Sequence, residues 1–232
     1  MKKEFRNSLR FPLLFVFCIG LIHLLKVQFE LSITDWGVFP LEAKGLKGIL
    51  LSPFVHGSWE HLFNNSIPLL ILGTALFFFY KKLAYKVWIY SIVFTGILLW
   101  LGGRPSYHIG ASGLVYALAS FLFLSGLLRK QAPLMATSLL VVFIYGGLVW
   151  GIFPSHQHIS WEGHLFGAVN GLFWAIYFRK EGPAQRKYSW DYEAEALDKL
   201  DGLEVIYEEI TGKDDDKPEE PSNIIYDYKP KK

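Results

Sequence analysis

Four polar residues of this largely apolar chain have types and spacings that suit nucleophilic catalysis. Ser112 lies between glycines in "YHIGASGLVYALASF", and a serine hydroxyl attacks a carbonyl when a nearby base accepts its proton. His164, in "WEGHLFG", is a residue of the type that most often acts as that base. His61 and Asn65, in "HGSWEHLFNN", are four residues apart, so they share one face of a helix and could donate hydrogen bonds to an oxyanion. These residues predict a serine nucleophile with a histidine base, provided that the fold brings the three segments together.

The composition indicates that the elements holding these residues lie in a membrane. Of the 232 residues, 52% are hydrophobic and 17% are aromatic, which excludes an ordinary soluble domain. Six apolar runs are long enough to span a bilayer, at about 11–28, 62–80, 84–101, 112–128, 133–153 and 163–178. We therefore expect an all-α, polytopic membrane protein with six transmembrane helices in residues 1–180.

The distribution of charge gives the orientation. Eleven Lys and Arg residues fall on one side of the predicted zigzag and four on the other, so the positive-inside rule places both termini in the cytoplasm. Residues 1–180 carry 15 basic and 6 acidic residues, whereas residues 181–232 carry 8 and 15. We expect residues 181–232 to form an acidic cytoplasmic tail that is partly disordered. The single cysteine, Cys18, excludes a disulfide within the chain.

This topology gathers the polar residues at one face. The runs that begin near 62, 112 and 163 all pass from outside to inside, so Ser112, His164, His61 and Asn65 share the outer side. A helix from Ser112 to Leu128 spans only about 25 Å, less than a hydrocarbon core of ~30 Å. We therefore expect Ser112 to lie below the outer surface and to need a cavity through which water reaches it.

Small residues explain how two of these helices can approach each other. The last predicted span carries glycines at a four-residue spacing: Gly163, Gly167 and Gly171. The fourth span begins with further small residues: Gly110, Gly113 and Ala117. Such residues permit close contact between helix backbones in membranes, so His164 can come within hydrogen-bond reach of Ser112. No acidic residue is placed to orient His164, and we predict a Ser–His dyad rather than a triad.

The three segments resemble the rhomboid intramembrane serine proteases. That family has His-x-x-x-Asn on its second helix, Gly-x-Ser-Gly at the start of its fourth and His-x-x-Gly-x-x-x-Gly on its sixth. All three motifs occur here in that order, and the resemblance covers roughly residues 10–180. It implies that Ser112 is the nucleophile, that His164 is the base and that His61 and Asn65 help to bind the oxyanion.

The resemblance also implies which residues support the proposed dyad and where the protein acts. The supporting residues are Gly110, Gly113, Tyr116, Gly167 and Gly171, with the ring of Tyr116 packed against His164. It implies single-pass transmembrane proteins as substrates, and a multi-pass enzyme in a lipid bilayer, which we expect to be a bacterial cytoplasmic membrane. We expect no cofactor, no metal and no nucleic-acid partner.

Other interpretations remain open. A lone serine between glycines in a membrane helix is more often a packing residue, and the chain could be a non-catalytic rhomboid-like protein that binds transmembrane segments. A metal-dependent membrane protein is a second alternative, because potential ligands gather toward the outer side: His56, Glu60, His61, His156, His158, Glu162 and His164. Their spacing argues against zinc. We interpret four histidines of the outer loops as ordinary interfacial residues: His56, His108, His156 and His158.

Overall fold

The computed structural model describes residues 2–130, 132–144, 151–154, 160–182 and 197. The chain divides into two units, Met1–Arg186 and Lys187–Lys232, and nearly all of the second lies outside the described residues. The acidic tail and its boundary at residue 180 therefore stay predictions. Helices are the only regular elements of the described residues, apart from one isolated antiparallel bridge between Val38 and His108. The all-α prediction is confirmed for this part of the chain.

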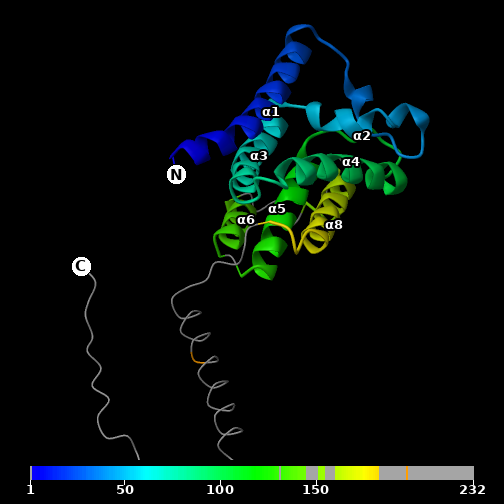
Figure 1. Ribbon diagram of the computed structural model, residues 1–232. Coiled ribbons are helices and arrows are strands. Elements are labelled where there is room, and N and C mark those ends of the chain that lie inside the picture. The colour runs from blue at the N-terminus through cyan, green and yellow to red at the C-terminus, as the bar shows by residue number, and fades with distance from the viewer. Residues whose placement is uncertain (1, 131, 145–150, 155–159, 183–196, 198–232) are drawn as a thin grey trace, which may run out of the picture. The chain divides into compact units, whose positions relative to one another are not determined.

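Six long helices make up most of the described chain (Figure 1). The long helices are α1 (Lys2–Gln28), α3 (Trp59–Phe79), α4 (Ala84–Gly102), α5 (Ser112–Leu128), α6 (Ala132–Ile144) and α8 (Trp161–Tyr177). Short helices occupy the connection between α1 and α3: η1 (Thr34–Trp36), η2 (Ala43–Gly45), α2 (Gly48–Leu51) and η3 (Ser52–Phe54).

Three of these helices, α1, α3 and α4, are long and apolar enough to cross a membrane, with mean hydropathies of 2.0, 1.7 and 1.5. The 17 residues of α5 are apolar but shorter than a full span, as the sequence predicts. The count of six spans stays a prediction. Two predicted boundaries were wrong: α1 already begins at Lys2, and residues 151–154 form turns and a bend, so the fifth helix does not extend to 153.

The centre of the bundle is α5, which lies between α3, α6 and α8 (Figure 1). A Cβ atom added at Gly167 or Gly171 of α8 would overlap the backbone oxygen of Gly113 or Ala117 on α5. The two helices therefore touch through their backbones, which only small residues allow. The hydroxyl of Ser120 on α5 donates to the Ala168 carbonyl at 2.9 Å and adds a polar link between the same helices.

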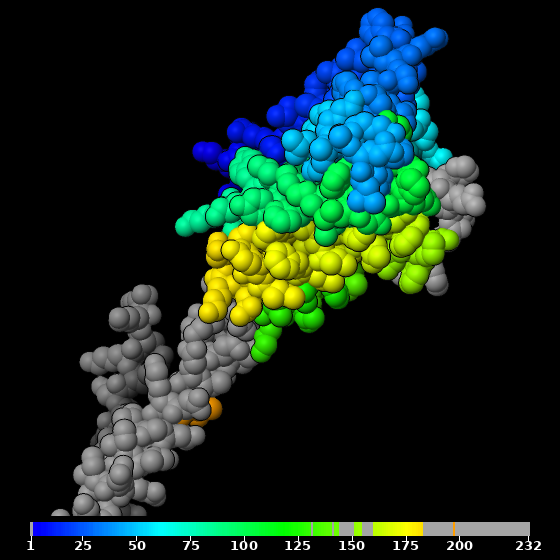
Figure 2. All heavy atoms as spheres, turned by 90° about the vertical axis from the view of Figure 1, so that its right-hand side faces the viewer, coloured from blue at the N-terminus to red at the C-terminus, as the bar shows by residue number. Residues whose placement is uncertain are grey.

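A neighbouring face of α8 is tied to α4 by a buried amide. The Asn170 Nδ2 atom donates to the Ser91 carbonyl at 3.1 Å and to Thr95 Oγ1 at 2.9 Å. Figure 2 shows the yellow surface of α8 lying directly against its green neighbours. Many large apolar side chains of the outer helices are exposed, among them Phe17 of α1 and Phe173 of α8, which suits a surface that faces lipid. The protein is an integral membrane protein in which α8 is held by both α5 and α4.

Candidate active site

The structure brings Ser112 and His164 into direct contact. Ser112 is the first residue of α5, and His164 lies in the first turn of α8, where its backbone N–H donates to the Ser160 carbonyl at 3.2 Å. The His164 Nε2 atom lies 2.8 Å from Ser112 Oγ, an ordinary distance for a hydrogen bond. The backbone contact between α5 and α8 thus places a hydroxyl and an imidazole in the arrangement of a nucleophile and its base.

The second ring nitrogen of His164 fixes the direction of that hydrogen bond. Its Nδ1 atom lies 2.9 Å from the carbonyl oxygen of Gly151. A carbonyl only accepts, so Nδ1 carries the proton, and in the neutral ring Nε2 is left to accept from the Ser112 hydroxyl. The group that orients this imidazole is therefore a backbone carbonyl, whereas the carboxylate of Glu162, two residues earlier on α8, lies 3.5 Å from Arg104 Nε.

An aromatic ring fixes the plane of the imidazole. Tyr116 lies one turn after Ser112 on α5, and its ring stacks on that of His164 with centroids 4.4 Å apart and planes 10° apart. A stacked neighbour hinders rotation of the imidazole about χ2, which is otherwise a soft torsion. Together with the Gly151 carbonyl, this contact holds Nε2 toward Ser112 Oγ.

The N-terminus of α3 presents two further donors to the same place. Ser58 caps this helix, and its hydroxyl accepts from the His61 N–H at 3.1 Å. His61 and Asn65 follow on one face, with Asn65 only 4% exposed. The Asn65 Nδ2 atom has no hydrogen-bond partner within the described part of the chain. A buried amide donor without a partner is costly, and at this position it is available to a ligand.

Gly110 lies against both donors and keeps the space beside them open. Its φ angle is +108°, a conformation that strongly favours glycine. A Cβ atom there would lie 2.6 Å from His61 Nε2 and 3.5 Å from Asn65 Nδ2. The Gly110 N–H donates to the Ser52 carbonyl at 2.9 Å, which holds this turn two residues before Ser112. Residues of α3, α5 and α8 thus lie around the start of α5.

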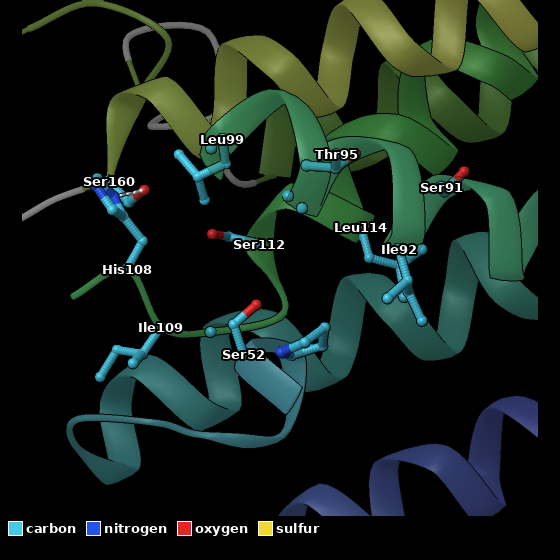
Figure 3. A pocket seen from close by; sticks show the side chains of 15 residues that line it. Ser52, Ser91, Ile92, Thr95, Leu99, His108, Ile109, Ser112, Leu114 and Ser160 are labelled. Atoms are coloured by element: carbon cyan, nitrogen blue, oxygen red, sulfur yellow. Dashed lines mark hydrogen bonds between the residues drawn. The ribbon is translucent and has the colours of Figure 1, made fainter. Parts of the chain in front are cut away.

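A small polar cavity opens beside Ser112 (Figure 3). It has about 30 Å³ of water-accessible space, enough for one or two water molecules. Its lining is rich in hydroxyl and imidazole groups: Ser52, Ser91, Thr95, His108, Ser112 and Ser160. Figure 3 shows the Ser112 oxygen pointing into this space. The sequence predicts a cavity through which water reaches Ser112, but it does not indicate which other groups line that cavity.

Two of the histidines interpreted as interfacial are buried, so that interpretation was wrong for them. His56 is 0% and His108 is 3% exposed. Burial lowers the pKa of His56 to about 3 and also lowers the pKa of His108. The ring of His56 packs edge-on against His61 with centroids 5.0 Å apart. His156 and His158 lie outside the described residues.

The predicted site residues are otherwise placed as follows. Four of the five supporting residues lie at the Ser112–His164 contact or the α5–α8 interface: Gly113, Tyr116, Gly167 and Gly171. The fifth, Gly110, lies against His61 and Asn65 of α3. Among the described residues, no group of three or more His, Cys, Asp or Glu side chains could hold a metal ion. Sequence reasoning missed the Gly151 carbonyl, because a backbone atom leaves no signal in residue type. It also missed His108, although this histidine directly precedes the segment "IGASG".

Comparisons with known proteins agree with the resemblance. Residues 44–181 match the family described as Rhomboid domain. Over 168 residues the chain is 35% identical to an uncharacterized protein of Mycobacterium tuberculosis, which covers 66% of this chain and 69% of the relative. Over 172 residues it is 33% identical to an uncharacterized protein of Mycobacterium leprae, covering 69% of this chain and 67% of the relative. The family match spans more than half of the chain and includes all three motif segments, and the chain therefore belongs to the rhomboid family.

Proposed function

We propose that this protein is an intramembrane serine endopeptidase that uses Ser112 and His164 as a catalytic dyad. The observation that carries the proposal is the 2.8 Å hydrogen bond between Ser112 Oγ and His164 Nε2, with His164 Nδ1 held on the Gly151 carbonyl. Ser112 Oγ attacks the carbonyl carbon of a peptide bond while its proton passes to Nε2. The imidazolium then gives that proton to the leaving amine, the C–N bond breaks, and an acyl-enzyme remains.

Hydrolysis of the acyl-enzyme needs a water molecule beside Ser112. The polar cavity has room for one or two and opens at the Ser112 hydroxyl. In this step His164 accepts the proton of the water as its oxygen attacks the ester, and it returns a proton to Ser112 Oγ as the acid product leaves. The enzyme is regenerated without any added group.

Both attacks place negative charge on the carbonyl oxygen. We assign its stabilisation to the Ser112 N–H, to the Asn65 amide and to the imidazole of His61. The N–H of Ser112 has no carbonyl of its own helix to bind, because it belongs to the first turn of α5. The open space at Gly110, bordered by His61 Nε2 and Asn65 Nδ2, supports the same location. Preorganised donors of this kind typically supply a large part of catalysis in acyl transfer.

We also propose the substrate class and the setting. Substrates are single-pass transmembrane proteins in a lipid bilayer, and the cut falls near the outer end of their membrane segment. A helical peptide bond is shielded, so the substrate must unwind locally, which small or helix-breaking residues favour. The membrane is a bacterial cytoplasmic membrane, and both termini of the enzyme lie in the cytoplasm.

The test is cleavage of a fluorescently tagged single-pass substrate in proteoliposomes by the parent and by Ser112→Ala. We expect product from the parent and none above background from the variant, at equal folding and reconstitution. Binding without cleavage by the parent would instead favour a non-catalytic rhomboid-like protein. Cleavage that is unchanged in Ser112→Ala would remove the serine mechanism.

A further inference from the structure

One buried residue outside the proposed dyad joins three segments that lie close to it. His108 lies in the loop before α5, and its backbone pairs with Val38 in both directions, at 2.9 Å and 2.8 Å. Its side chain is almost fully buried, and both ring nitrogens have partners. Nδ1 lies 2.7 Å from Ser160 Oγ, and Nε2 lies 3.0 Å from the Arg104 carbonyl. His108 therefore links the segment after α1, the loop before α5 and the start of α8.

The His108–Ser160 contact lies four residues before the dyad on both segments, in the loop that leads into α5 and at the N-cap of α8. His108 precedes Ser112 by four residues, and Ser160 precedes His164 by four, so both contacts join residues 52 apart in the chain. Ser160 is the N-cap residue of α8, and its carbonyl accepts from the His164 N–H at 3.2 Å. If Ser160 moves relative to His108, we therefore expect the distance between His164 and Ser112 to change as well.

The chemistry of the ring sets the direction of each hydrogen bond. The Arg104 carbonyl can only accept, so Nε2 carries the proton and Nδ1 accepts from the hydroxyl of Ser160. Burial lowers the pKa of His108, which keeps this neutral tautomer populated at neutral pH. The charged groups nearest to it are Arg104 and Glu162, which are 3.5 Å apart and link the same loop to the same turn of α8. In Figure 3 His108 and Ser160 lie side by side at the edge of the cavity that holds Ser112.

We propose that His108 is a positioning residue, which sets the distance between Ser112 Oγ and His164 Nε2 through its hydrogen bond to Ser160. This proposal rests on the proposed protease function, because a positioning role has meaning only if Ser112 reacts. His108 touches neither residue of the dyad in any hydrogen bond of the described structure. Its loss should therefore slow the chemical step and leave substrate binding nearly unchanged, because displacements of about 1 Å at reacting groups can cost up to about 10²-fold in rate.

The experiment measures the rate at which a fluorophosphonate labels Ser112, together with kcat and KM for a transmembrane substrate. His108→Leu keeps the volume and removes both hydrogen bonds, and Ser160→Ala removes only the partner hydroxyl. We expect each to lower the labelling rate and kcat by about 10- to 10²-fold with KM within about twofold. His108→Asn, whose Oδ1 stands near the former Nδ1, should recover much of the rate. The double variant should be no slower than His108→Leu alone, because both changes break one contact.

The matched control is Ser120→Ala, which removes another hydrogen bond between α5 and α8, two turns farther from the cavity. It should leave the labelling rate of Ser112 within about twofold of the parental rate, because Ser120 does not line the cavity. If His108→Leu and Ser160→Ala label no more slowly than Ser120→Ala, the positioning role is wrong while the protease function stands. If the parent itself is not labelled at Ser112, the protease function fails and the positioning role fails with it. Should His108→Leu not fold, Ser160→Ala alone decides between these outcomes.

Discussion

Replacing Asn65 by alanine isolates one proposed oxyanion donor, because this side chain has no hydrogen bond to lose within the described part of the chain. The amide is 4% exposed, and its Nδ2 atom has no partner within the described residues. In the proposed mechanism Nδ2 donates to the charged oxygen of the transition state, and loss of such a donor typically costs about 10²–10³ in rate, or ~2.7–4 kcal/mol. The donor acts on the transition state more than on the bound substrate, so kcat should fall by this factor with little change in KM.

The same change should leave the folded protein nearly as stable. Removing a buried donor without a partner avoids its desolvation cost, which offsets the packing that the side chain loses. We expect the free energy of unfolding to change by no more than about 1 kcal/mol. Partial activity should remain, because the Ser112 N–H and the His61 imidazole still reach the oxyanion.

Asn170 offers the matched control, since it is also a buried asparagine but has a satisfied amide. Its Nδ2 atom donates to the Ser91 carbonyl and to Thr95 Oγ1. Asn170→Ala should lose about 2 kcal/mol of stability, because it loses two hydrogen bonds at ~1 kcal/mol each. Under conditions in which the variant is fully folded, its rate of Ser112 labelling should stay within a few fold of the parental rate. Asn65→Ala should therefore slow labelling and spare stability, whereas Asn170→Ala should lower stability and spare labelling.

The assays are Ser112 labelling by a fluorophosphonate, substrate cleavage in proteoliposomes and unfolding in mild detergent. Labelling also passes through an oxyanion, so it should slow in step with cleavage in Asn65→Ala. Parental rates of labelling and cleavage in this variant would refute the reasoning. Asn65 would then be a packing residue, and the oxyanion site would have to be built from other groups.

Three further predictions concern the turn before Ser112, metals and pH. Gly110→Ala should lower the labelling rate by more than about 10²-fold, because the new Cβ would lie 2.6 Å from the His61 ring at a φ of +108°; labelling at the parental rate would show that this space is not used. Activity should survive EDTA, and loss of activity that zinc restores would overturn the serine mechanism. The pKa of His56 is lowered from 6.5 to about 3, chiefly by burial, so the folded state binds fewer protons than the unfolded state as pH falls below 6.5. The burial of His56 should therefore contribute a loss of stability of about 2 kcal/mol between pH 7 and pH 5, and His56→Phe should reduce the slope of stability against pH in unfolding assays; an equal slope in the variant would show that other groups cause it.

The elements that carry the candidate site could be predicted because hydropathy and small-residue spacing are local signals. The predicted run 112–128 coincides with α5, and the glycines of α8 do contact the backbone of α5. The start of α1 was missed for a physical reason. A hydropathy window ends where charges begin, whereas good helix formers continue the helix from the membrane into water.

The groups that orient the dyad could not be predicted in the same way. The Gly151 carbonyl acts through a backbone atom, and any residue at that position would carry one. His56 precedes the helix cap Ser58 and looked like an exposed loop residue, yet its carbonyl accepts from Lys26 Nζ at 2.8 Å and its ring lies against His61. His108 depends on a partner 52 residues away. Such contacts follow from the packing of distant segments, which a single sequence does not specify.

The most direct test of the central claim is labelling with a fluorophosphonate probe, followed by peptide mapping, for the parent, Ser112→Ala and His164→Ala in native membranes. The account predicts one modified site in the parent, Ser112, because its hydroxyl is hydrogen-bonded to His164 Nε2 at 2.8 Å. It predicts no labelling of Ser112→Ala and at most about 10⁻³ of the parental rate for His164→Ala, as for other hydrolases that lose their base. An unlabelled parent that still cleaves its substrate, or labelling of Ser112 that is independent of His164, would contradict the account.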